Sequence, residues 1–190
     1  MSSTKKSPSL DQQNQNPKYP PLTTEFLSTG CFMLYKNMGG FFGDMIEKHQ
    51  IRMGIAPERA RYVHIDVLGP RQWAIRVNPP RSEVVDVFKR YRGVSACMVR
   101  YKAPDYDIGR RYVAWWAVSH NNLRYDYLGV LKFKLGWLFH RKNLYFCSEN
   151  AAWALRQEYP TAFKGLQTHT IMPGHFLGPQ FEVIWRGIIL

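Results

Sequence analysis

Two short runs rich in β-branched residues, each closed by a pair of breaker residues, constrain the fold of this chain most strongly. The run Arg61–Leu68 is followed at once by Gly69 and Pro70, and the run Gln72–Asn78 is followed by Pro79 and Pro80. Glycine and proline interrupt the hydrogen-bond pattern of a strand and end it. Because the connection between the runs is so short, the second run must return beside the first, which predicts an antiparallel hairpin.

Further elements are predicted around this hairpin. Residues 96–102 read as a third strand, and apolar residues at helical spacing predict helices over 39–49, 82–91, 108–120 and 147–159. Ser82 is expected to cap the second of these helices, and Pro160 follows the last. Helices packed around a small antiparallel sheet make an α+β domain.

The ends of the predicted domain follow from composition. The chain has 190 residues, and residues 1–22 consist mainly of Ser, Gln, Asn, Lys and Pro. Such a segment buries too little apolar surface to offset its ordering entropy, so we expect a disordered polar tail over 1–22 and one globular domain over 23–190. No run approaches the roughly 20 apolar residues of a membrane span. The basic start lacks the apolar core of a signal peptide, which predicts cytoplasmic synthesis.

The charge balance favours anionic partners. Lys and Arg number 26 against 14 acidic residues, which gives a net charge of +12. A field of this sign attracts nucleic acid, anionic lipid or an acidic cell-wall polymer. The basic residues are scattered and no nucleic-acid recognition module is evident, so specific nucleic-acid binding ranks last among these partners.

One of the three cysteines has the setting of a nucleophile. Cys31, Cys97 and Cys147 are too few and too far apart for a disulfide scaffold or a zinc ribbon. Cys147 is predicted at the first turn of a helix, where unpaired N–H groups and the helix dipole favour a thiolate. A thiol nucleophile also needs a base. Of the six histidines, His64 is the one that lies inside a predicted strand, which would hold its ring on a defined face.

Four segments occur in the order and approximate spacing of the circularly permuted branch of the NlpC-type, papain-like cysteine hydrolases. Together they resemble that family from about residue 39 to 185. Tyr62–Gly69 resembles the strand that carries the base histidine, and Leu123–Leu131 resembles a Tyr-Asp motif ahead of the nucleophile. Tyr145–Glu149 resembles the nucleophile motif, and Ile171–Phe176 with Phe181–Val183 resembles the closing segment.

The resemblance implies a permuted papain-like fold in which Cys147 is the nucleophile and His64 the base, with no metal or cofactor. The family usually places a third polar group, often a carboxylate, on the strand after the histidine strand. In this chain Arg76 occupies the expected position. A guanidinium has no acceptor for an imidazole N–H. Asn78 shares the face of Arg76 and carries an amide oxygen, while Asp66 lies two residues beyond His64.

We therefore predict that Asn78 contacts the His64 ring, because cross-strand neighbours in a hairpin come within roughly 5 Å at Cβ. Asp66 is expected to reach the ring only obliquely from the same strand. Arg76 is predicted to turn towards substrate or solvent. Tyr125, in the Tyr-Asp motif, is predicted to line a substrate groove together with Arg76.

The predicted function is that of a cysteine peptidase or amidase that acts on peptidoglycan peptides. The cell wall is anionic and would attract a protein with a basic surface. Two alternatives stay open. The first keeps the thiol and changes the substrate to a lipid ester or amide, as in relatives of the lecithin:retinol acyltransferase kind. The second is a virion-associated structural or binding protein that has the fold without turnover, in which Arg76 replaces the expected acid and the polar tail docks to a larger assembly.

Overall fold

The computed structural model describes residues 19–78, 81–119, 124–125 and 144–190, and over these the chain has a mixed α+β fold. Six antiparallel strands form the main sheet in the order β4-β3-β2-β1-β5-β8, and the two-residue strands β6 and β7 extend it beyond β4. The strands are β1 Phe32–Lys36, β2 Tyr62–Leu68, β3 Trp73–Asn78, β4 Arg81–Asp86, β5 Ser95–Tyr101, β6 Arg124–Tyr125, β7 Leu144–Tyr145 and β8 Phe181–Ile188.

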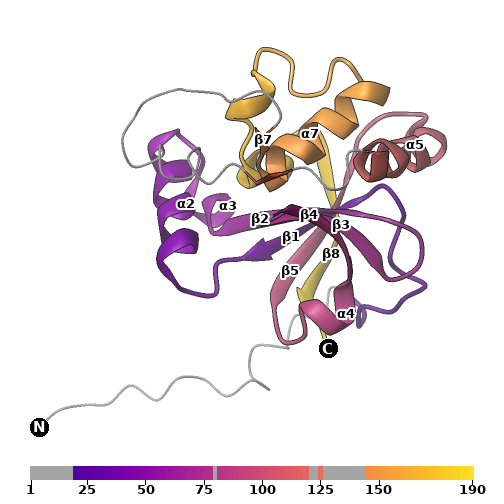
Figure 1. Ribbon diagram of the computed structural model, residues 1–190, viewed down its shortest axis with the longest axis horizontal. Coiled ribbons are helices and arrows are strands. Elements are labelled where there is room, and N and C mark those ends of the chain that lie inside the picture. Colours follow the sequence, from indigo (N-terminus) through magenta and orange to yellow (C-terminus); the bar gives the residue numbers. More distant parts are fainter. Residues whose placement is uncertain (1–18, 79–80, 120–123, 126–143) are drawn as a thin grey trace, which may run out of the picture.

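Two of the helices cover one face of this sheet. In Figure 1, α5 and α7 lie above the strands, α2 and α3 flank them on one side, and β5, β8 and α4 turn away below. The helices are α2 Phe41–Arg52, α3 Pro57–Ala60, α4 Val87–Arg90, α5 Tyr106–Ser119 and α7 Cys147–Glu158, with short 3-10 turns η1 Thr168–Thr170 and η2 Pro173–Leu177. None of the helices within the described ranges is long and apolar enough to cross a membrane.

The predicted hairpin is present. Strands β2 and β3 pair antiparallel through Val67 with Ile75 and through Leu68 with Ala74. The backbone N–H of Gly69 donates to the carbonyl of Trp73 at 2.8 Å and closes the turn. The predictions of α2, α5, α7 and β5 are also confirmed within a few residues of their ends.

The helix predicted over 82–91 is wrong for most of its length. Residues 81–86 form β4, which pairs with all of β3, and only Val87–Arg90 is helical. Ser82 does not cap a helix but lies buried in the strand opposite Val77. The cap is Asp86, whose carboxylate accepts the N–H of Lys89 at 3.1 Å. The tertiary reason is that β3 needs a hydrogen-bonding partner along its second edge, which outweighs the helical spacing of the valines.

A strand absent from the sequence prediction lies at the centre of the sheet. Strand β1 pairs with β2 on one side and with β5 on the other. Its first four residues, Phe32 to Tyr35, are all buried. A strand covered on both faces has a continuous apolar run without alternation, so periodicity alone does not distinguish it from a buried helix.

The folded body begins earlier than the composition suggested. Leu22 is buried in the core, and the indole N–H of Trp185 donates to the carbonyl of Pro20 at 2.8 Å. The predicted tail over 1–22 is therefore too long by at least its last three residues, and its first 18 lie outside the described residues.

Gln50 connects three parts of the fold from the inner side of α2. Its side chain is fully buried, and its amide nitrogen donates to the carbonyls of Ala60 and Tyr62 at 2.7 and 2.9 Å. Its amide oxygen accepts the N–H of Gly174 at 2.7 Å. These bonds hold the start of β2 and the turn η2 against α2, so the strand that carries His64 is fixed at its beginning.

We expect Gln50→Leu to lower the free energy of unfolding by about 3 kcal/mol, because it leaves buried backbone groups without a partner at about 1–3 kcal/mol each. The exposed Gln157 offers the matched control Gln157→Leu, for which we expect less than about 0.5 kcal/mol. Urea unfolding followed by circular dichroism measures both. Equal stability of the two variants would contradict this role for Gln50.

Candidate active site

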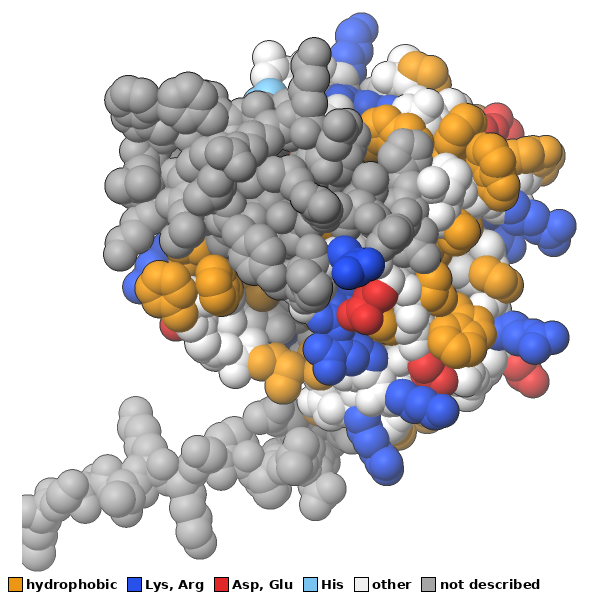
Figure 2. Space-filling model, in the orientation of Figure 1, with side chains coloured by type: hydrophobic (Ala, Val, Ile, Leu, Met, Phe, Trp, Pro, Cys, Tyr) orange, Lys and Arg blue, Asp and Glu red, His pale blue; other side chains and the backbone are white. Residues whose placement is uncertain are grey.

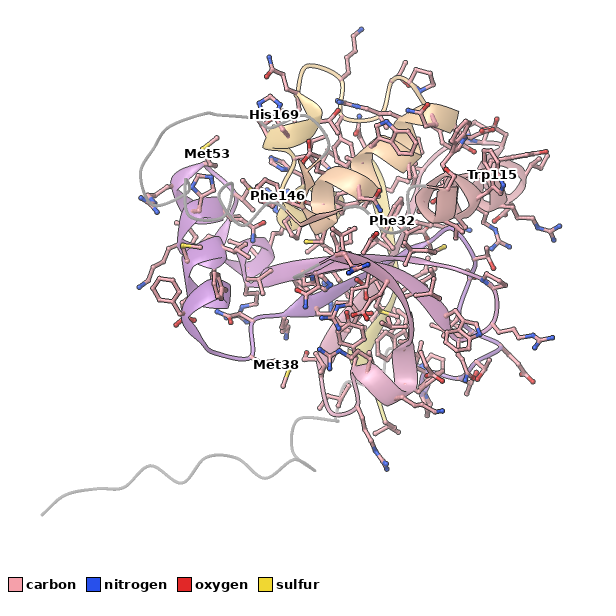
Figure 3. All side chains as sticks on the ribbon, in the orientation of Figure 1. Phe32, Met38, Met53, Trp115, Phe146 and His169 are labelled. Atoms are coloured by element: carbon pink, nitrogen blue, oxygen red, sulfur yellow. The ribbon has the colours of Figure 1, made fainter. Side chains whose placement is uncertain are left out.

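Cys147 is the first residue of α7. The preceding Phe146 is extended, with φ −92° and ψ 166°, so the chain turns into the helix at the cysteine itself. Figure 3 labels Phe146 at this end of the helix. First-turn N–H groups of a helix have no carbonyl partner within it, and the helix dipole adds positive potential there. This position favours a thiolate and offers donors to a developing oxyanion.

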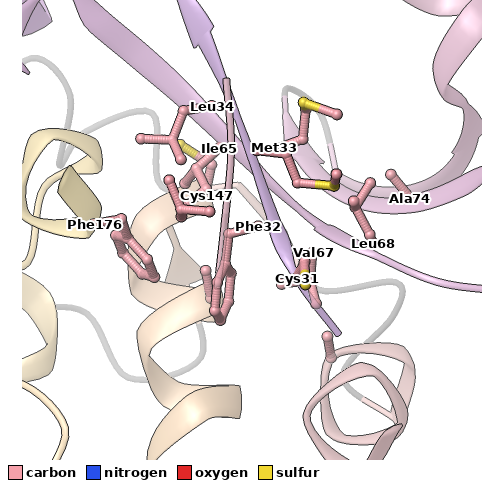
Figure 4. Close-up of a cluster of buried hydrophobic side chains, with 14 of the residues drawn as sticks. Cys31, Phe32, Met33, Leu34, Ile65, Val67, Leu68, Ala74, Cys147 and Phe176 are labelled. Carbon is pink, nitrogen blue, oxygen red and sulfur yellow. The ribbon is translucent and has the colours of Figure 1, made fainter. Parts of the chain in front are cut away.

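Close packing fixes the start of α7 against the sheet. The hydroxyl of Ser148 donates to the carbonyl of Ile171 at 2.7 Å, and three alanines of α7, Ala151, Ala152 and Ala154, are buried. Their small side chains let the helix lie close to β2 and β3. Figure 4 shows Cys147 among buried side chains of β1 and β2, and its exposed fraction is 8%.

The ring of His64 lies between Asp66 and Cys147. Its Nε2 atom is 2.8 Å from Oδ1 of Asp66, on the same strand, and 19% of the His64 side chain is exposed. Cys147 is close enough to the same ring to influence the pKa of His64. With Nε2 engaged by Asp66, Nδ1 is the ring nitrogen left for Cys147.

Charges around His64 favour its protonated form. Burial alone would lower the pKa of the imidazole, but the charges of Asp66 and Cys147 and hydrogen bonds with both raise that pKa from 6.5 to about 10. At neutral pH the ring is therefore an imidazolium beside the thiol. This is the condition for a thiolate–imidazolium pair, in which the sulfur is the nucleophile and the ring is the acid.

Two tyrosines enclose Asp66 and the His64 ring. The rings of Tyr35 and Tyr91 stack with their centroids 3.7 Å apart, and Tyr35 also stacks on His64 at 5.7 Å. Burial and then the charge of Asp66 raise the pKa of both phenols, so both hydroxyls remain protonated beside the carboxylate. Asp66 itself is 1% exposed. The two phenols therefore lie close enough to the buried carboxylate to interact with its charge.

The prediction that Asn78 contacts His64 is wrong. Among the residues that the structure describes, no hydrogen bond joins Asn78 to the His64 ring, and Asp66 accepts from the ring instead. The recorded ladder between β2 and β3 ends at Val67 and Ile75, whereas Asn78 pairs with Arg81 of β4. Strands β2 and β3 are therefore no longer paired at the level of His64. Asp66, two residues further along the same strand, reaches the ring instead.

Arg76 does not turn to solvent. It is 4% exposed, and Nη1 lies 3.6 Å from Oε1 of Glu83, the residue opposite it on β4. Its role in substrate binding stays a prediction. The backbone of Tyr125 lies in β6, and its side chain is outside the described part of the chain, as is most of the Tyr-Asp segment 123–131.

The other cysteines lack such a setting. Burial is the largest cause that raises the pKa of Cys31 to about 12 and that of Cys97 to about 11, so both remain thiols at neutral pH.

Sequence reasoning missed Tyr35 and Tyr91. Tyr35 lies on the unrecognised strand β1, opposite His64, and Tyr91 lies in the connection after α4. Only recognition of β1 and its register would have brought Tyr35 to the site.

Comparison with models of protein families and with curated proteins finds no match. The chemistry of the site therefore rests on its own geometry. A thiol at a helix start, an imidazole beside it and a buried carboxylate on the other ring nitrogen form the arrangement for nucleophilic acyl transfer.

We expect His64 to titrate well above pH 8, and Asp66→Asn to bring its pKa down to neutral pH or below, because burial then outweighs the remaining hydrogen bonds. Titration of the imidazole Cε1–H resonance by NMR measures this. Asn78→Ala is the matched control and should leave the curve unchanged. A shift in Asn78→Ala with none in Asp66→Asn would return the orienting role to Asn78.

The raised pKa of His64 also predicts how the free energy of unfolding changes with pH. Because the folded pKa of His64 lies above the ordinary value of 6.5, its protonation stabilises the fold fully below about pH 6.5, and this contribution is lost as the pH rises towards 10. We expect wild type to lose more free energy of unfolding than Asp66→Asn between pH 6.5 and 9.5. Urea unfolding at the two pH values measures the difference, and equal losses would contradict it.

Proposed function

We propose that this protein is a thiol hydrolase, a cysteine peptidase or amidase that cleaves amide bonds by acyl transfer. The observation that carries the proposal is the juxtaposition of Cys147, at the first turn of α7, with a His64 ring whose other nitrogen is held by Asp66. The resemblance to permuted papain-like hydrolases supports the same pair of residues on independent grounds, since it rests on motifs alone.

In the proposed first step, the Cys147 thiolate attacks the carbonyl carbon of the amide. The carbonyl electrons move to oxygen, and N–H groups at the start of α7 are placed to stabilise that oxyanion. The tetrahedral intermediate collapses, the C–N bond breaks, and the His64 imidazolium gives its proton to the leaving amine. A thioester on Cys147 and a neutral His64 remain.

Water completes the turnover. Neutral His64 accepts a proton from water as the oxygen attacks the thioester, and the sulfur leaves as a thiolate beside the imidazolium. Asp66 keeps Nε2 engaged in both half-reactions, so Nδ1 stays directed at the reacting atoms. This assignment removes the main support for a structural protein without turnover, because a carboxylate on β2 supplies the acceptor that Arg76 cannot.

Peptidoglycan peptides are the substrate we propose. They carry amide bonds and carboxylates within an anionic wall, and the protein has a net charge of +12. Figure 2 shows Lys and Arg side chains spread over the visible face rather than gathered in one track, as expected for general attraction to a polyanion. The same charge is compatible with assembly into a virion that meets the wall.

A lipid amide or ester is the second candidate, and one observation favours it. The outer side of α5 exposes Ile108, Tyr112 and Trp115 at helical spacing, along a surface hollow of about 690 Å³. Figure 3 labels Trp115 on this outer side. Aromatic and aliphatic side chains beside arginines are typical of helices that rest on a lipid interface.

Alkylation tests whether the thiol is activated. We expect iodoacetamide at pH 7 to modify Cys147 at least about tenfold faster than a cysteine in an unfolded peptide, because a helix start and a neighbouring imidazolium activate a thiol towards alkylation. Cys31 and Cys97 are internal controls and should remain unmodified. Peptide mapping by mass spectrometry measures all three. A Cys147 that reacts no faster than the free thiol would favour a structural protein.

Cleavage of purified cell-wall sacculi tests the reaction itself. We expect wild type to release peptides, Cys147→Ala to release none, and His64→Gln to lose at least about 10²-fold, the usual contribution of a general acid–base. Cys31→Ala is the matched control and should retain activity. If wild type and Cys147→Ala are equally inactive on sacculi, the peptidoglycan assignment fails, and turnover of fluorescent acyl-lipids by wild type alone would establish the second candidate.

A further inference from the structure

Arg76 is a buried cation whose hydrogen-bonding capacity is largely unused. The residue is 4% exposed, and within the described ranges neither Nε nor Nη1 has a hydrogen-bond partner. A guanidinium carries five N–H donors, and burying them without acceptors is among the more costly arrangements in a protein. A charge that the fold buries at such cost, with no close acceptor among the residues that the structure describes, points to a partner from outside this part of the chain.

The acidic neighbours do not fill this role. Glu83 is the one carboxylate recorded as an ion-pair partner of Arg76 within the described residues, at 3.6 Å, and 52% of the Glu83 side chain is exposed. A contact this long to a half-solvated carboxylate is weak. Oδ1 of Asp66 accepts from His64, and its Oδ2 atom has no hydrogen-bond partner among the residues that the structure describes.

Arg76 belongs to the same group of side chains as the candidate nucleophile. It lies on β3, one residue after Ile75, and β3 packs against α7, the helix that begins at Cys147, as β2 does. The charges of Arg76, Asp66 and Cys147 all act on the hydroxyl of Tyr91. The guanidinium is thus within electrostatic reach of the atoms around the thiol.

We propose that Arg76 binds a carboxylate of the substrate, adjacent to the carbonyl that Cys147 attacks. A planar guanidinium with free Nε and Nη1 atoms matches the two oxygens of a carboxylate in a paired, charge-assisted geometry. The proposal rests on the proposed function and narrows its substrate to acyl donors that carry a negative charge beside the scissile amide. Arg76 is then a specificity-determining residue and takes no part in proton transfer.

Two alkylating reagents of nearly equal size test this directly. Iodoacetate carries a carboxylate and iodoacetamide is neutral, so the ratio of their rate constants on Cys147 reports anion recruitment. We expect this ratio to exceed that of an unfolded cysteine peptide about tenfold, the equivalent of one charge-assisted hydrogen bond. Arg76→Gln should return the ratio to the peptide value, and Arg76→Lys should lie between. Arg90→Gln, at an exposed position on α4, is the matched control.

Each outcome separates this inference from the proposed function. A ratio that Arg76→Gln leaves unchanged overturns the carboxylate site even if Cys147 is fast. If Cys147 reacts slowly with both reagents, the proposal that its thiol is activated is contradicted. The ratio of the two rate constants can still be measured, and it still decides the role of Arg76. Thermal unfolding distinguishes a structural role. If the contact with Glu83 were a strong ion pair, Arg76→Gln would melt at lower temperature, whereas removal of a weakly paired buried charge should leave the melting temperature equal or higher.

Discussion

The hydrogen bond between Nε2 of His64 and Oδ1 of Asp66 is the interaction on which the candidate site depends. It fixes which ring nitrogen faces Cys147, it places a negative charge beside the imidazole, and it raises the pKa of His64 against the opposing effect of burial. Both partners lie on one strand, two residues apart, so no loop movement separates them. The carboxylate that engages the ring therefore comes from the histidine strand itself.

Burying charges costs free energy, and the surrounding fold compensates for it. Tyr35 stacks on both His64 and Tyr91, and the charge of Asp66 acts on the hydroxyls of both tyrosines. Beneath them the central strand β1 contributes a continuous buried run from Phe32 to Tyr35. A large apolar core lets a small domain retain a few costly polar groups, and in this chain those groups gather where the thiol lies.

The site is also assembled from segments far apart in the chain. Ser148 hydrogen-bonds Ile171, which holds the start of α7, and Gln50 hydrogen-bonds both Tyr62 and Gly174, which holds the start of β2 and the turn η2. The thiol and the imidazole are therefore positioned by residues that have no chemical role. Rigid support of this kind is what keeps a nucleophile and its base within reach of each other.

The sequence by itself determined the β2–β3 hairpin and the helix that begins at Cys147, because glycine and proline breakers and a helix start act locally. It also singled out Cys147 and His64 as candidates, which the structure brings together. Only the tertiary structure decided the rest. Residues 82–86 became a strand because β3 required a second partner, and β1 went unrecognised because a fully buried strand has no alternation. Asp66 rather than Asn78 orients His64, since this depends on where the β2–β3 ladder ends, and strand register is a property of the whole sheet.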